Sequence, residues 1–209
     1  QYYKATNDIE FMKDYGFEVF FESARFWASR LEYNQAKDQY EINNVMGPDE
    51  YKEHIDNNAF INYMVNWQFN QALEYIRFLN ENHKQDLESL KERIDLKDNE
   101  IKNWAELKDK IYLPQPGEDN IIPQFEGFEN LDEIDLSKYK KGDVGDIFND
   151  LGWEEIINSK VSKQADLVML TYLLEDKFKE EIIRANFDYY EPLTLHDSSL
   201  SPGIHAAVG

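Results

Sequence analysis

The strongest constraint on the fold is the spacing of apolar residues, which recur every three or four positions over long stretches. Residues 17–31 carry one such stripe, which consists of Phe17, Phe20, Phe21, Ala24, Trp27, Ala28 and Leu31. A stripe with this period lies along one face of a helix that packs against a core. Residues 57–79 are apolar on most sides, which predicts a second, deeply buried helix capped by Asp56 or Asn57.

Further helices are predicted along the rest of the chain. Asn7 followed by Glu10 fits an N-cap and its returning acid, and Pro202 stands where the first turn of a helix favours proline. The other predicted helices cover residues 87–94, 99–111, 163–174 and 175–184. The predicted loops cover residues 34–56, with a short strand at 40–42, and 186–201. Helical hairpins joined by long loops predict an all-α fold.

Composition excludes several classes of function. The chain has 209 residues, 42% of them apolar, which is sufficient for a packed core. A formal net charge of −20 disfavours nucleic acid and anionic membranes as partners, because both are negatively charged. The chain has no cysteine, so disulfides, thiolate metal sites and a cysteine nucleophile are excluded. Neither a transmembrane run nor a signal peptide is apparent, and we therefore expect a cytoplasmic protein.

The first candidate for chemistry is the turn Gly47-Pro48-Asp49-Glu50, which places two adjacent carboxylates before a buried helix. Cleavage of a glycosidic bond needs an acid that protonates the leaving oxygen. A proline-stiffened turn fixes the direction of Glu50, and repulsion from Asp49 and Asp56 would oppose its ionisation. The alternative is an ordinary turn, which these four residues alone would favour.

The second candidate is the segment Leu195-His196-Asp197-Ser198-Ser199-Leu200-Ser201-Pro202. An imidazole, several hydroxyls and the backbone N–H groups of a helix N-terminus are the parts of an anion site. A serine-rich helix cap with a loop histidine is the alternative. Lys163 and Gln164 form a third candidate, because a cation beside an amide can hydrogen-bond sugar hydroxyls, although a surface lysine at a helix start is the commoner case. The four histidines show no ligand spacing, so we expect no metal site.

Taken together, these motifs resemble a known family. They are Val45-Met46-Gly47-Pro48-Asp49-Glu50-Tyr51 with Asp56-Asn57-Asn58, Gln124-Phe125-Glu126-Gly127-Phe128, Lys163-Gln164-Ala165-Asp166, and Tyr190-Glu191-Pro192 continuing through His196 to Pro202. The chain resembles the catalytic domain of the inverting disaccharide phosphorylases of glycoside hydrolase family 65, which act on maltose, kojibiose, nigerose or trehalose. The resemblance implies a barrel of six inner and six outer helices. Residues 1–209 would be about half of that single (α/α)6-barrel catalytic domain, a piece of a larger protein.

The resemblance also implies an activity and roles for individual residues. The expected reaction is phosphorolysis of an α-glucosyl disaccharide with inversion, giving β-glucose 1-phosphate and a released sugar. Glu50 matches the general acid, Lys163 and Gln164 match the residues that bind the transferred glucose, and His196, Ser198 and Ser199 match the phosphate-binding loop. Inorganic phosphate is then a co-substrate, no cofactor is expected, and the full-length protein is expected to form a homo-oligomer.

Two alternatives remain open from the sequence. A glycoside hydrolase on the same scaffold would need a carboxylate base to activate water, and in this family a glutamate at position 196 would suggest one. Because position 196 is histidine, the phosphorylase is favoured. The second alternative is an inactive half-barrel that serves as a sugar-binding or assembly module, since the expected N-terminal half of the barrel lies outside these residues. We expect the isolated 209 residues to be inactive.

Overall fold

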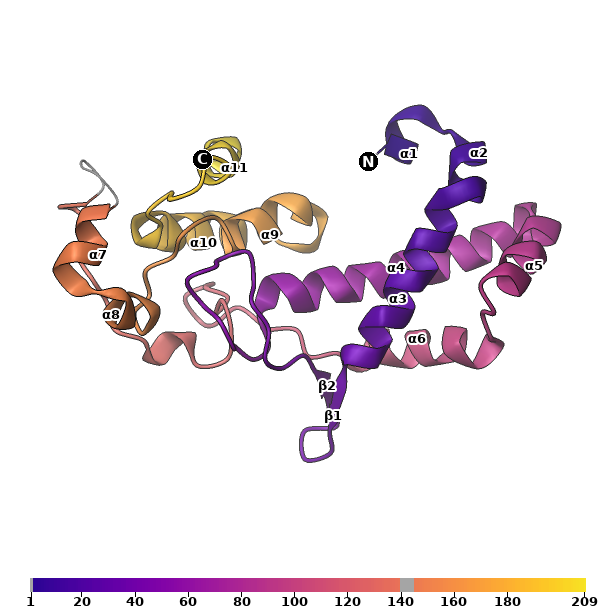
Figure 1. Cartoon of the computed structure of the whole chain (residues 1–209), viewed down its shortest axis with the longest axis horizontal. Helices are drawn as coiled ribbons and strands as arrows, with labels where there is room; N and C mark the ends of the chain where they lie inside the picture. Colours follow the sequence, from indigo (N-terminus) through magenta and orange to yellow (C-terminus); the bar gives the residue numbers. More distant parts are fainter. Residues whose placement is uncertain (1, 140–144) are drawn as a thin grey trace. The chain divides into compact units, whose positions relative to one another are not determined.

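The computed structural model describes residues 2–139 and 145–209, and most of them lie in helices (Figure 1). The chain forms two compact units, Gln1–Glu41 with Met64–Tyr112, and Ile42–Tyr63 with Leu113–Gly209. The prediction that the whole chain belongs to one barrel domain stays a prediction. None of the helices in the described part of the chain combines the length and apolarity needed to cross a membrane.

The first unit contains long helices and one hairpin. Its elements are α1 (Tyr2–Thr6), α2 (Ile9–Phe11), a π-helical segment (Met12–Gly16), α3 (Phe17–Arg30), β1 (Glu32–Asn34), β2 (Gln39–Glu41), most of α4 (Ala59–Asn82), α5 (Lys84–Arg93) and α6 (Asp98–Lys110). The two strands pair antiparallel with Tyr33 opposite Tyr40. Three residues of the apolar stripe of α3 are buried, namely Phe17, Phe21 and Ala24, and Phe21 packs against the indole of Trp104 on α6.

Two predicted helix caps are wrong by one or two residues. Asp8 rather than Asn7 caps α2, since its carboxylate accepts a hydrogen bond from the backbone N–H of Phe11. Asn58, rather than Asp56 or Asn57, accepts from the N–H of Ile61 at the start of α4, with 3.0 Å between Oδ1 and N. Asn7 and Asn57 both adopt positive φ angles, 53° and 54°. Asparagine tolerates this left-handed conformation, so each turns the chain before the helix begins.

The second unit contains shorter helices and long connecting segments. Its elements are the start of α4, a 3-10 turn (Phe128–Asn130), α7 (Gly145–Leu151), α8 (Trp153–Ile157), α9 (Leu167–Leu173), a second 3-10 turn (Glu175–Lys177), α10 (Glu180–Leu193) and α11 (Ser201–Val208). Pro202 lies in the first turn of α11, as predicted. The predicted helix at residues 163–174 begins only at Leu167, because residues 163–166 pair with a distant turn described below.

Helix α10 extends through residues that the sequence indicated as loop. Tyr190 is buried and donates a hydrogen bond from its hydroxyl to the carbonyl of Ile122, with 2.6 Å between the oxygens. Asn186 is also buried, and its side chain accepts from the N–H of Ile122 and donates to the carbonyl of Asn120. These contacts hold the helix to the segment around residues 120–122. Pro192 lies in the last turn of α10, which ends one residue later at Leu193.

Candidate active site

The turn that carries Glu50 is joined to residues 163–166 through backbone atoms. The side-chain amide of Gln164 donates to the carbonyl of Pro48. In the opposite direction, the backbone N–H of Lys163 donates to Oδ1 of Asp49, with an N–O distance of 2.8 Å. Because these bonds involve both the backbone and the side chains of the two segments, their relative position is fixed although they are far apart in sequence.

Glu50 and Lys163 meet directly at this junction. Nζ of Lys163 lies 2.5 Å from Oε2 of Glu50, and the two side chains are 26% and 53% exposed respectively. The hydrogen bond to Glu50 raises the pKa of Lys163. The sequence suggested that Asp49 and Asp56 would be the charges acting on Glu50. Instead Asp49 is completely buried, and Asp56 accepts a hydrogen bond from the N–H of Asn44. The charge in contact with Glu50 is therefore a cation.

Asp49 is an internal anchor of the turn. Its Oδ1 accepts from the N–H groups of Tyr51 and Lys163, and its Oδ2 accepts from the side-chain amide of Gln124 at 3.0 Å. Of the two adjacent carboxylates in the motif, one is thus used to hold the turn and the other remains accessible. Because Asp49 holds the turn from inside, the side chain of Glu50 is directed towards solvent.

A second buried carboxyl, Asp166, lies behind the same turn. Its Oδ2 accepts from the amide of Asn58 at 3.2 Å and from the N–H of Asp49 at 3.4 Å. Burial, together with the charge of Asp49, raises the pKa of Asp166 to about 8. A Cβ atom on Gly47 would lie 2.5 Å from Nδ2 of Asn58 and 2.6 Å from Oδ2 of Asp166. Only glycine allows the backbone to approach these two side chains so closely.

Lys52 follows the turn and is buried as well. Its ammonium group donates to the carbonyls of Ile156 and Ile157 at 3.0 and 3.1 Å, and these carbonyls lie at the end of α8. Burial lowers the pKa of Lys52 to about 8. The lysine therefore fixes the turn to α8, and its charge partly compensates that of Asp49.

The predicted anion loop lies next to Lys163. The N–H of Asp197 donates to the carbonyl of Lys163 at 3.0 Å, and the N–H of Leu195 donates to the carbonyl of Ser162 at 2.9 Å. The hydroxyl of Tyr51 donates to Oδ2 of Asp197, which ties the loop to the turn that carries Glu50. Burial and the carboxylate of Asp197 both raise the pKa of Tyr51. The structure thus brings all three predicted segments together.

The serines of this loop differ in exposure and contacts. The hydroxyl of Ser198 accepts from the N–H of Leu200, and its carbonyl accepts from the N–H of Ser201, so residues 198–201 form a turn into α11. Ser199 is exposed. Ser201 is buried, and its hydroxyl accepts from the N–H of Ala165 at 3.0 Å. Ser198 and Ser199 are therefore placed at the protein surface beside the Lys163 segment, whereas Ser201 is part of the support.

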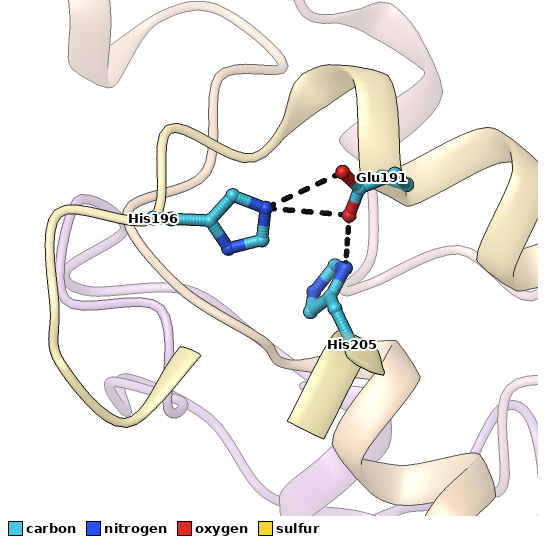
Figure 2. Close-up of side chains that lie close together, drawn as sticks. All are labelled: Glu191, His196 and His205. Atoms are coloured by element: carbon cyan, nitrogen blue, oxygen red, sulfur yellow. Dashed lines mark hydrogen bonds and ion pairs between the residues drawn. The ribbon is translucent and has the colours of Figure 1, made fainter. Parts of the chain in front are cut away.

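His196 belongs to a cluster that the sequence did not indicate, shown in Figure 2. Its Nδ1 lies 2.9 Å from the hydroxyl of Ser201, and its Nε2 lies 3.3 Å from a carboxylate oxygen of Glu191. The same carboxylate contacts Nδ1 of His205, a buried residue of α11. Sequence reasoning placed Glu191 in a motif without a role and predicted none for His205. Ser201 and His205 are four positions apart and share a face of a helix, but this spacing does not indicate the contact with Glu191.

Among the residues that the structure describes, Glu191, His196 and His205 form a group that could hold a metal ion. One ligand atom from each lies within 4.8 Å of the others. Two imidazoles and a carboxylate are a ligand set that zinc accepts. In this structure the three side chains contact one another, which already gives the carboxylate two partners. The prediction that the protein needs no metal stays a prediction.

Comparisons with known proteins identify the family of the chain. The model of the glycosyl hydrolase family 65 central catalytic domain matches residues 1–209. The chain belongs to glycoside hydrolase family 65. A kojibiose phosphorylase of Halothermothrix orenii is 53% identical over 208 residues, which cover 100% of this chain and 26% of that protein. An α,α-trehalose phosphorylase of Thermoanaerobacter brockii is 37% identical, over 98% of this chain and 26% of that protein.

A solved structure supports the family fold. It comes from the human microbiome, and its name proposes a kojibiose phosphorylase. It matches with a TM-score of 0.84 and 28% identity, over 97% of this chain and 29% of that chain. The predicted fold class, all-α and part of the family's helical barrel, is thereby confirmed. The present chain spans about a quarter of the length of the curated family members that it matches, as their coverage of 26% shows.

Proposed function

We propose that the protein to which this chain belongs cleaves an α-linked glucosyl disaccharide with inorganic phosphate, with inversion at the anomeric carbon. The observation that carries the proposal is the direct contact of Glu50 with Lys163, next to a loop that is hydrogen-bonded to the Lys163 backbone. An acid, a sugar-binding cation and an anion loop are the three parts that phosphorolysis requires. Family members named kojibiose and trehalose phosphorylase support the same activity.

In this mechanism Glu50 donates a proton to the glycosidic oxygen while the bond from that oxygen to the anomeric carbon breaks. An oxygen of phosphate attacks the same carbon from the opposite face, forming β-glucose 1-phosphate. The released sugar keeps the proton, and Glu50 regains one from solvent. No protein base is needed, because phosphate near neutral pH is already an anionic nucleophile.

The binding roles follow from the chemistry of the side chains. Lys163 donates hydrogen bonds to hydroxyls of the transferred glucose and stands beside Glu50. Gln164 already donates to Pro48, and its amide oxygen is an acceptor of the kind that a sugar hydroxyl needs. His196, with both ring nitrogens in contact with protein groups, has a fixed orientation, and Ser198 and Ser199 supply hydroxyls for phosphate.

The competing activity is hydrolysis. It would require a carboxylate to activate water, and the exposed Asp197, which accepts from Tyr51, is the residue in this loop that could do so. The two activities separate in one experiment on the full-length protein, in which glucosyl disaccharides are incubated with and without phosphate. We expect β-glucose 1-phosphate only when phosphate is present. Glucose release at an undiminished rate without phosphate would disprove the proposal.

A further inference from the structure

One buried carboxyl group belongs to the turn that carries Glu50, and a second lies directly behind that turn. Asp49 is 0% exposed and Asp166 is 4% exposed, and the N–H of Asp49 donates to Oδ2 of Asp166. A buried carboxylate loses its hydration, and two of them in one place also repel each other. The pair is therefore more stable with one negative charge than with two.

Burial raises the pKa of both carboxyl groups, and the hydrogen bonds favour Asp49 as the one that carries the charge. Asp49 accepts from three N–H donors, of Tyr51, Gln124 and Lys163, and these bonds favour an ionised carboxylate. Asp166 accepts at Oδ2 only, and its buried Oδ1 has no hydrogen-bond partner within the described residues. A buried oxygen without a partner costs less in a neutral carboxyl group than in an ionised one, so this arrangement favours the protonated form of Asp166.

We propose that Asp166 carries a proton in the working enzyme and that, as a neutral side chain, it positions the turn that presents Glu50. This inference rests on the proposed function, which makes Glu50 the general acid. Asp166 accepts hydrogen bonds from the N–H of Asp49 and from the side-chain amide of Asn58 at the start of α4. Its carboxyl group also lies against the backbone of Gly47, where there is no room for a Cβ atom. A second buried charge here would repel Asp49 and displace the turn.

Other titratable groups interact with this pair, and their titration must be distinguished from that of Asp166. Tyr190 on α10 interacts electrostatically with Asp166, while Tyr51, Lys52 and Lys163 interact with Asp49. Burial raises the pKa of both tyrosines, so they stay neutral, and the pKa of Lys163 is also raised. Lys52 is the exception, because its pKa of about 8 coincides with that of Asp166.

The test compares two matched replacements in the full-length protein, Asp166→Asn and Asp49→Asn. Asparagine imitates a protonated Asp166, so this variant should keep most of the phosphorolysis rate at pH 7. At position 49 an asparagine NH₂ group would face N–H donors, and we expect a loss of at least ~10²-fold because the turn is displaced. The rate of the wild type should fall as the pH rises through about 8, and Asp166→Asn should abolish that fall.

Thermal unfolding provides a readout that does not depend on activity. The pKa of Asp166 is higher in the folded protein than its value of about 3.9 in an unfolded chain. The folded state therefore binds the extra proton between about pH 4 and pH 8, and this group makes the wild type less stable as the pH rises through that window. The melting temperature of Asp166→Asn relative to wild type should increase over the same window. The contribution of Lys52 to stability changes only above about pH 8 and in the opposite direction. Because burial lowers its pKa in the folded state, this group makes the protein more stable as the pH rises.

Each outcome decides the proposal. Asp166→Asn with the expected melting profile and no loss of rate near pH 8 supports it. If Asp166→Asn fails to fold or is as inactive as Asp49→Asn, the charge on Asp166 is required and the proposal is wrong. If the melting profile is as expected but the fall in rate near pH 8 also persists when Asp166→Asn is combined with Lys52→Arg, which keeps residue 52 charged at this pH, Asp166 does not position the turn. If the protein shows no phosphorolysis, the proposed function fails, while the melting profile still tests the proton.

Discussion

Replacing Glu50 by glutamine tests the assignment of the general acid. The amide is nearly isosteric with the carboxyl group and can still accept a hydrogen bond from Lys163, but it has no acidic proton. General acid catalysis typically contributes ~10²–10⁴-fold to a rate, which corresponds to about 3–5 kcal/mol of transition-state stabilisation. We expect kcat to fall within this range.

The structure predicts that the same replacement leaves folding almost unchanged. The Glu50–Lys163 pair is partly open to solvent, at 53% and 26% side-chain exposure. Exposed ion pairs contribute roughly 0–1 kcal/mol to stability, and the turn is held by Asp49 and Gln164 rather than by Glu50. The melting temperature should therefore change by no more than a few degrees, and the KM for disaccharide by no more than a few-fold.

The assay measures kcat on the full-length protein with saturating phosphate and disaccharide. Glu53→Gln is the matched control, because Glu53 is an exposed acid three positions further along the chain. α-Glucosyl fluoride provides a second control, since fluoride leaves without protonation and Glu50→Gln should retain most of its rate on this substrate. A near-normal rate on disaccharide, or an equal loss on the fluoride, would refute the assignment.

Three further predictions concern Lys163, His196 and Gly47. Lys163→Ala should raise the KM for disaccharide more than that for phosphate, and equal increases would assign Lys163 to the anion site. His196→Ala should raise the phosphate concentration for half-maximal rate at least several-fold, and an unchanged phosphate dependence would refute the anion loop. His196→Glu should repel phosphate and reveal slow hydrolysis with inversion. Gly47→Ala should lower the melting temperature, because its Cβ would overlap Asn58 and Asp166 at a cost of ~1–3 kcal/mol, and a melting temperature equal to wild type would contradict that packing.

The parts of the fold that sequence periodicity predicted correctly are those in which one helix face is buried. The predicted helix at residues 17–31 corresponds to α3, and that at residues 99–111 corresponds to α6, each within one residue at either end. The errors occur where tertiary contacts override local preference. Residues 163–166 are apolar-flanked but not helical, since their backbone and side chains pair with the turn at residues 47–50.

The site was predictable from the sequence only in part. Residues 50 and 163 are 113 positions apart, and no local pattern places them in contact. The family resemblance assigned both residues to one site, and the structure supplied the contact. The cluster of Glu191, His196 and His205 was missed because sequence spacing of ligands within one helix was the criterion, whereas α10, the anion loop and α11 each contribute one residue.

Most residues in the motifs of the site hold the turn at residues 47–50 in place. In Lys163-Gln164-Ala165-Asp166, the backbone of the first residue, the amide of the second and the carboxyl of the fourth all contact the turn at residues 47–50. The turn in turn uses Asp49 for its own anchoring and Gly47 for close approach. Because these contacts hold the turn that carries Glu50, losing one of them should displace Glu50. A substitution at such a residue should therefore alter kcat although its side chain does not contact the sugar. Sequence motifs of this kind therefore reflect how the turn with Glu50 is held as well as which side chains it presents.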